Sequence, residues 1–201
     1  MIDLKEIVAL YDKRVKHLGY DAHSVGWRST EQQTLRFKVL TRDIDLVDKS
    51  IMDIGCGFGD LYDFLCKSDS KPLQYLGIDI SGEVIKIAKL NHRDVRGVTF
   101  FNKELMTPPE EKFDYAIVSG SLNYKVAEDM YAYLEEFAKI YRTRVYEGLL
   151  INLLSTKVDY MQEIHAHYDP VLVQKIFEKY FQNVKLIEGY GLYEFTIQAL
   201  Y

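Results

Sequence analysis

The sequence has few cysteines and no long apolar segment. Its 201 residues include only two cysteines, Cys56 and Cys66, which excludes a disulfide framework and a multi-cysteine zinc site and favours a reduced, cytoplasmic protein. No apolar run approaches the roughly 20 residues that a membrane-spanning helix requires, so we expect no membrane partner. The first residues also lack the pattern of a signal peptide, which agrees with a cytoplasmic location.

Basic residues are also scarce relative to acidic ones. There are 25 lysines and arginines against 30 aspartates and glutamates, a net charge of −5, and no basic tract. A long nucleic-acid backbone is therefore not an expected partner. Hydrophobic residues make up 48% and charged residues 27%, which is typical of a globular domain with a sizeable core. Composition leaves the oligomeric state open.

The apolar periodicity alternates between helix and strand. It predicts an N-terminal helix over 1–20 that Gly19 ends, a loop over 21–28, and a second helix from Ser29 or Thr30 to about Thr41. We then expect strands at 50–54, 74–80, 98–102, 113–120 and 149–155, two final strands within 184–190 and 192–201, and helices at 60–67, 82–92, 127–145 (capped by Gly148) and 170–181. This order predicts an α/β fold, a doubly wound, Rossmann-like sheet of seven mostly parallel strands with a C-terminal antiparallel hairpin at one edge.

The stretch "MDIGCGFGD" joins the first of these strands to a helix through Gly55, Gly57 and Gly59. A glycine-rich turn of this kind lets a ligand approach the backbone, which favours a nucleoside-containing ligand. The third glycine comes one position earlier than in the dinucleotide fingerprint. Asp53, on the strand itself, would repel a pyrophosphate and suits an ammonium group instead. Both features argue against a nicotinamide cofactor.

The same stretch resembles motif I of the class I S-adenosylmethionine-dependent methyltransferases. "YLGIDIS" resembles the motif on the second strand of that family, "FDYAIVSG" the motif on the fourth, and the terminal hairpin its last two strands. The resemblance covers roughly residues 45–201 and implies S-adenosyl-L-methionine as the cofactor. We therefore expect a methyltransferase domain over 45–201 and an N-terminal helical extension over 1–44 that covers the cofactor pocket.

The resemblance also implies roles for residues that follow the predicted strands. The turn residues Gly55, Cys56, Gly57 and Gly59 would lie along the methionine part of the cofactor, with Asp53 near its ammonium group. For Cys56 we favour a small turn residue over a nucleophile.

Four further positions would complete the cofactor site. Asp79, followed by Ile80, would accept both ribose hydroxyl protons. Glu104, with Leu105, would meet adenine, although Asn102 or Lys103 could occupy that point. Ser119 and Gly120 would bring a backbone carbonyl to the ammonium group.

Two residues of the N-terminal segment have two open interpretations. Trp27 could cover the pocket and Arg36 could meet the cofactor carboxylate. Alternatively, both belong to a surface helix packed on the sheet.

The acceptor side is expected where Asn123, Tyr124, His165 and His167 follow the fourth and fifth strands. Tyr124 or either histidine could act as a general base, and a plain polar loop is the alternative for "HAHYDP". Two histidines and one aspartate do not make a metal site, so we expect no metal. "SGSLNY" differs from the motif of amino-methylating DNA enzymes. We therefore expect in-line methyl transfer to a small molecule; the alternatives are a protein side chain, a non-catalytic cofactor-binding subunit and an NAD-dependent oxidoreductase.

Overall fold

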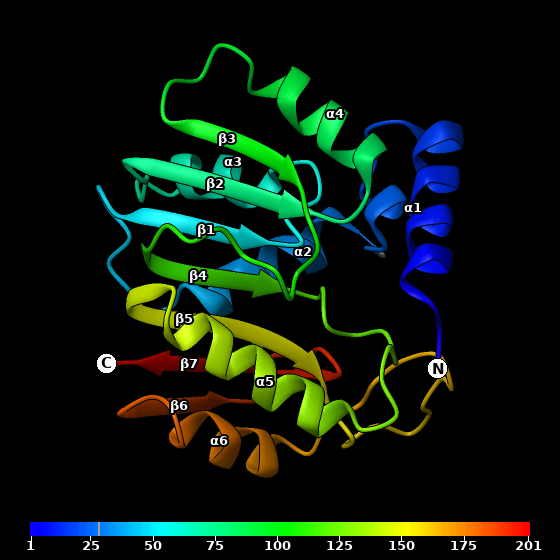
Figure 1. The fold of residues 1–201 in the computed structure, drawn as a ribbon, viewed down its shortest axis with the longest axis vertical. Helices are drawn as coiled ribbons and strands as arrows, with labels where there is room; N and C mark the ends of the chain where they lie inside the picture. The colour runs from blue at the N-terminus through cyan, green and yellow to red at the C-terminus, as the bar shows by residue number, and fades with distance from the viewer. Residues whose placement is uncertain (28) are drawn as a thin grey trace.

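The computed structural model describes residues 1–27 and 29–201, which build one seven-stranded sheet with helices on both faces (Figure 1). The strand order is β3-β2-β1-β4-β5-β7-β6, so the chain reverses direction across the sheet between β1 and β4. The strands are β1 Ser50–Ile54, β2 Gln74–Asp79, β3 Val98–Asn102, β4 Phe113–Ser119, β5 Val145–Leu154, β6 Asn183–Ile187 and β7 Glu194–Leu200. The helices are α1 Leu4–Leu18, η1 Ala22–Val25, α2 Thr30–Leu40, α3 Asp60–Lys67, α4 Gly82–Asn91, α5 Met130–Arg142 and α6 Pro170–Glu178.

Alternating side chains of the buried strands supply two separate cores. Ile51 packs in one cluster with residues of α2, α3 and α4, whereas Met52, its neighbour in β1, packs in another with residues of α5 and α6. Adjacent residues of a strand point to opposite faces, so continuous apolar strands such as β1 need helices on both sides. This arrangement confirms the predicted doubly wound sheet.

Helix ends follow local capping chemistry. The side chains of Ser29 and Ser81 accept hydrogen bonds from backbone N–H groups in the first turns of α2 and α4, as their positions before the apolar runs indicated. Gly19 ends α1, as predicted. The predicted loop over 21–28 instead contains the short 3-10 helix η1, which is capped by the Asp21 side chain. Arg28, the last residue of that predicted loop, lies outside the described residues.

The fifth strand begins earlier than predicted. The helix expected over 127–145 spans only Met130–Arg142, and Gly148 lies inside β5 rather than capping that helix. A Cβ atom at Gly148 would lie 2.8 Å from the carbonyl oxygen of Ala199 in β7. This glycine is therefore needed for the close approach of the two strands. The sequence alone does not distinguish this role from that of a helix cap.

The C-terminal hairpin closes one side of the sheet as predicted. β7 pairs antiparallel with both β5 and β6, so β6 forms the edge. Helix α1 lies beyond the carboxyl ends of the parallel strands, which the arrowheads mark, and next to α4 (Figure 1). Val15 of α1 packs there against Phe58 and Val84. Among the described residues, no helix has the length and apolar character needed to cross a membrane.

Candidate functional site

A cavity of about 830 Å³ opens at the carboxyl ends of the parallel strands. Its volume is near the upper end of the roughly 300–1,000 Å³ that is typical of ligand pockets. Every predicted site residue except Gly59 lines it: Trp27, Arg36, Asp53, Gly55, Cys56, Gly57, Asp79, Ile80, Glu104, Leu105, Ser119, Gly120, Tyr124, His165 and His167. Asn102 and Lys103, the alternatives to Glu104, are not part of the lining. The topology thus gathers side chains from seven separate segments around one space.

The glycine turn forms one wall of the cavity. Gly55 has φ +72°, and a Cβ atom there would lie 1.8 Å from Oγ of Ser121, so no other residue fits. Gly57 has φ +55°, but a Cβ atom would meet only Val25, at 3.5 Å or more. Gly59 lies behind the turn, where a side chain would collide with His92 and Phe100. The three glycines therefore satisfy different requirements.

Two acids lie behind this turn, Asp53 buried and Asp79 half-buried. Asp53 is almost fully buried and accepts a hydrogen bond from the Tyr75 hydroxyl. Burial raises the pKa of Asp53 to about 7. Asp79 accepts hydrogen bonds from the backbone N–H groups of Gly57 at 3.1 Å and Ser81 at 2.9 Å. Burial raises the pKa of Asp79 as well. Both carboxyl groups line the cavity, where a cation or hydroxyl donor would favour their ionised forms.

The thiol of Cys56 is not set up as a nucleophile. It is buried, and burial together with the neighbouring Asp53 raises its pKa well above the ordinary value. A reactive cysteine needs the opposite shift. Its sulfur lies 3.5 Å from the backbone oxygen of Gly57, which agrees with a small residue filling a tight turn.

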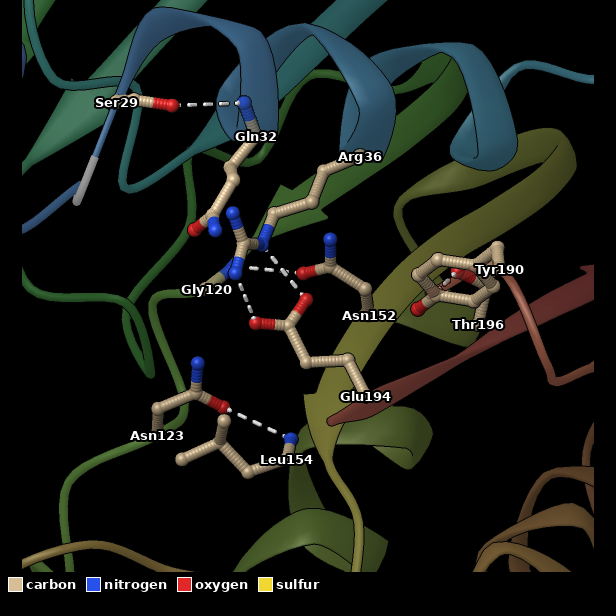
Figure 2. Close-up of polar contacts among 10 residues, drawn as sticks. All are labelled: Ser29, Gln32, Arg36, Gly120, Asn123, Asn152, Leu154, Tyr190, Glu194 and Thr196. Atoms are coloured by element: carbon tan, nitrogen blue, oxygen red, sulfur yellow. Dashed lines mark hydrogen bonds and ion pairs between the residues drawn. The ribbon is translucent and has the colours of Figure 1, made fainter. Parts of the chain in front are cut away.

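A second wall is a polar network between α2 and the C-terminal half of the sheet (Figure 2). Arg36 donates to Glu194 of β7 from Nε at 2.7 Å and from Nη2 at 2.5 Å. Its guanidinium group also lies 4.7 Å from the ring centroid of Trp27. The side chain of Asn152 accepts a hydrogen bond from the backbone N–H of Gly120 at 2.8 Å. Arg36 and Trp27 are therefore fixed against the cavity rather than spread over the surface.

Three buried polar atoms of this wall have no hydrogen-bond partner among the described residues. They are Nη1 of Arg36, Oγ of Ser119 and Nδ2 of Asn152. A buried polar atom without a partner costs free energy, typically about 1–3 kcal/mol. Arg36 and Ser119 line the cavity, which indicates that a polar ligand or water there supplies the missing partners of these two residues.

On the acceptor side, two loops that follow β4 and β5 are tied together. Tyr124 and His165 form an isolated antiparallel bridge, with their rings 5.3 Å apart. Burial, His167 and Arg14 lower the pKa of His165, and burial lowers that of His167. Both imidazoles are thus neutral near pH 7, the form that can accept a proton. Tyr124 and both histidines line the same cavity, and their roles toward an acceptor stay a prediction.

The sequence predicts that an N-terminal extension covers the pocket, but the residues of α1 that line the cavity are not among the predicted site residues. Leu4, Ile7, Tyr11, Arg14 and Leu18 line it from one helix face. Their spacing of three and four residues is visible in the sequence and places them in one stripe. The partner residues Glu194 and Asn152 carried no such signal, because their place depends on how β7 inserts beside β5.

The comparisons with known proteins agree with this geometry. A family model described as a methyltransferase domain matches residues 52–144. A protein of Mycobacterium tuberculosis named as a methyltransferase is 30% identical over 154 residues, which cover 74% of this chain and 90% of that protein. Demethylmenaquinone methyltransferase of Lactococcus lactis is 26% identical over 176 residues, covering 87% of this chain and 61% of the relative.

Among solved structures, magnesium protoporphyrin IX methyltransferase from Synechocystis PCC 6803 has the same fold. The superposition of the two chains has a TM-score of 0.68 at 16% sequence identity. It covers 98% of this chain and 99% of the Synechocystis chain. The identity is too low to carry more than the fold. Together with the matching family model and the Mycobacterium relative, the seven-stranded sheet and its glycine turn place the chain in the class I S-adenosylmethionine-dependent methyltransferases.

Proposed function

We propose that the protein transfers the methyl group of S-adenosyl-L-methionine to a small molecule bound in the 830 Å³ cavity. One observation carries the proposal: the glycine turn, the carboxyl groups of Asp53 and Asp79, and the unpaired polar atoms of Arg36 and Ser119 line that cavity. The residues fit the cofactor, which combines an amino-acid end that bears both charges with ribose hydroxyls and an adenine base. The cavity also leaves room for an acceptor next to Tyr124.

The amino-acid end of the cofactor is assigned to the Arg36 side of the cavity. Nη1 of Arg36 donates to the carboxylate, while Glu194 holds the other two nitrogens of the guanidinium group. Asp53 and the backbone of Ser119 and Gly120 attract the ammonium group. Trp27, which lies against Gly120, covers this end of the pocket.

The nucleoside end is assigned to the opposite side of the glycine turn. The Asp79 carboxylate accepts from the ribose hydroxyls, and Gly57 leaves the space that the cofactor occupies. Glu104 and Leu105 line the cavity beyond β3 and meet adenine. Gly59 contributes indirectly, because its missing side chain lets His92 and Phe100 support the turn.

When bound, the cofactor supplies an electrophilic methyl group, so the protein mainly has to orient the acceptor and exclude water. Tyr124 and His165 hold the acceptor at the junction of their two loops. His165 or His167 takes the proton of a hydroxyl or amine acceptor, since both rings are neutral near pH 7. We expect turnover to persist at pH 6.5 and to fall at lower pH, as the acting imidazole becomes protonated.

A small acceptor is favoured over a protein side chain because Tyr124 and both histidines line the 830 Å³ cavity. Two similar proteins are named for small acceptors, demethylmenaquinone and magnesium protoporphyrin IX. A non-catalytic subunit that only binds the cofactor is the rival function.

The test is a methyl-transfer screen with radiolabelled S-adenosylmethionine against a metabolite library, with an unfolded protein extract as the macromolecular arm. Label in a small product, lost in a His165/His167 double alanine variant that still binds S-adenosylhomocysteine, would support the proposal. Label only in protein would refute a small acceptor. Cofactor binding without any transfer would favour the non-catalytic subunit.

A further inference from the structure

Arg14 is the one charged residue on the stripe of α1 that lines the cavity. The other members of the stripe, Leu4, Ile7, Tyr11 and Leu18, are apolar or aromatic. A long apolar stripe covers a pocket without help from a charge, so an arginine in its middle needs a separate explanation. Arg14 lies one turn from Tyr11, so both side chains share the face of α1 that lines the cavity.

The guanidinium group of Arg14 forms no hydrogen bond or ion pair with any of residues 1–27 and 29–201. Its described neighbours include the Tyr11 ring, whose centroid lies 5.7 Å from Cζ, and Gly26, where an added Cβ atom would lie 3.7 Å from Nη1. By contrast, Arg36, the other arginine of the lining, is neutralised by Glu194 at 2.5 Å. Arg14 therefore offers a free positive charge to whatever binds beside it.

Aromatic rings surround this charge. The Tyr11 ring meets Tyr124 edge-on with centroids 6.2 Å apart, and the Tyr124 ring meets His165 at 5.3 Å. Arg14 is also close enough to His165 to help lower its pKa. Three rings in series and one unpaired guanidinium group thus border the same part of the cavity. Such rings favour a flat, aromatic partner, and a guanidinium group favours an oxyanion.

We propose that the acceptor is a planar aromatic molecule carrying an anionic oxygen group, and that Arg14 selects it by pairing with that group. The inference rests on the proposed function, since it concerns the acceptor half of the same cavity. The anionic group that pairs with Arg14 belongs to the acceptor, because the carboxylate of the cofactor is already assigned to Arg36. Arg14 is thereby a specificity residue that contacts the substrate rather than one that moves a proton.

The inference is testable with a matched pair of probes, 4-hydroxybenzoate and 4-hydroxybenzamide, which share a ring and a hydroxyl group but differ in charge. Their affinities for the full chain are measured by calorimetry or ligand-observed NMR, with and without S-adenosylhomocysteine. We expect the wild type to bind the benzoate at least about tenfold more tightly, or about 1.4 kcal/mol. In Arg14→Met the ratio should fall to about one, and Arg14→Lys should recover part of it.

Lys13, an exposed neighbour that does not line the cavity, supplies the control: Lys13→Met should leave the ratio unchanged. Equal binding of both probes to the wild type, or an undiminished ratio in Arg14→Met, would overturn the inference. A tenfold loss of S-adenosylhomocysteine affinity in Arg14→Met would overturn it as well, by assigning Arg14 to the cofactor. If the wild type binds no S-adenosylhomocysteine, the proposed function fails instead, and the probe ratio measured without it still tests Arg14.

Discussion

Replacing Glu194 by alanine removes the carboxylate that neutralises Arg36. The two side chains expose only 5% and 10% of their surface, and two hydrogen bonds of 2.7 and 2.5 Å join them. Breaking a buried pair by deleting one partner typically costs about 3–5 kcal/mol, because the remaining charge stays buried. A domain of this size loses about 2–4 °C of melting temperature per kcal/mol, so we expect Glu194→Ala to melt about 6–20 °C lower.

Removing both charges at once should restore the melting temperature. A buried pair replaced by apolar residues is often neutral or stabilising, so Arg36→Met/Glu194→Leu should melt near the wild type. The double variant nevertheless lacks the Nη1 donor that we assign to the cofactor carboxylate. Its affinity for S-adenosylhomocysteine should therefore fall by about 10- to 150-fold, the equivalent of about 1.5–3 kcal/mol for a hydrogen bond with a charged group.

The two measurements separate stability from binding. Thermal unfolding without ligand reports the ion pair, and calorimetry with S-adenosylhomocysteine reports the contact to the cofactor. A loss below about 1 kcal/mol in Glu194→Ala would refute the account of a desolvated pair. Wild-type affinity in the folded double variant would refute the assignment of Arg36 to the cofactor while leaving the ion pair intact.

Three further predictions concern the glycine turn and the acids behind it. Asp79→Ala should weaken cofactor binding by about 1.5–3 kcal/mol, and a 2′-deoxyribose analogue should lose much less additional affinity in the variant than in the wild type; equal losses would remove Asp79 from the ribose. Gly57→Val should stay folded apart from about 1–2 kcal/mol of strain at φ +55°, since a Cβ atom meets only Val25, yet calorimetry should detect no cofactor binding. Cofactor affinity of the wild type should weaken below about pH 7, as Asp53 gains a proton. Tyr75→Phe should move this change to higher pH, because the Tyr75 hydrogen bond lowers the pKa of Asp53. An identical pH profile in the variant would contradict this role of Tyr75.

The sheet could be predicted because each of its strands carries a local signal. The apolar runs around Ile51 and Ile117, the serine caps and the glycine turn all specify structure through nearby residues. Where a residue has two local interpretations, the sequence alone does not decide between them. Gly148 suits both a helix end and a strand interior, and only its contact with β7 decides between them.

Residues of the candidate site could be predicted where they lie in or just after predicted strands. Asp53, Asp79 and Tyr124 follow or occupy predicted strands, and parallel strands bring their carboxyl ends to one edge. Glu194 lies near the start of the last strand, so its pairing with Arg36 depends on contacts across 158 positions of the chain. The place of α1 over the cavity depends likewise on tertiary packing against Phe58 and Val84. The Glu194–Arg36 pair leaves no periodic trace in the sequence. The stripe of α1 does leave one, but the trace does not say which part of the protein the stripe packs against.

The central claim is that S-adenosylmethionine binds against the glycine turn. Its most direct test is the thermal stability of the wild type and Gly57→Val with S-adenosylhomocysteine or NADH. At a ligand concentration 100 times Kd, binding adds about 2.7 kcal/mol, which corresponds to about 5–11 °C for a domain of this size. The account predicts such a rise for the wild type with S-adenosylhomocysteine and none for the variant or for NADH. Stabilisation by NADH, or the same rise in Gly57→Val, would contradict it.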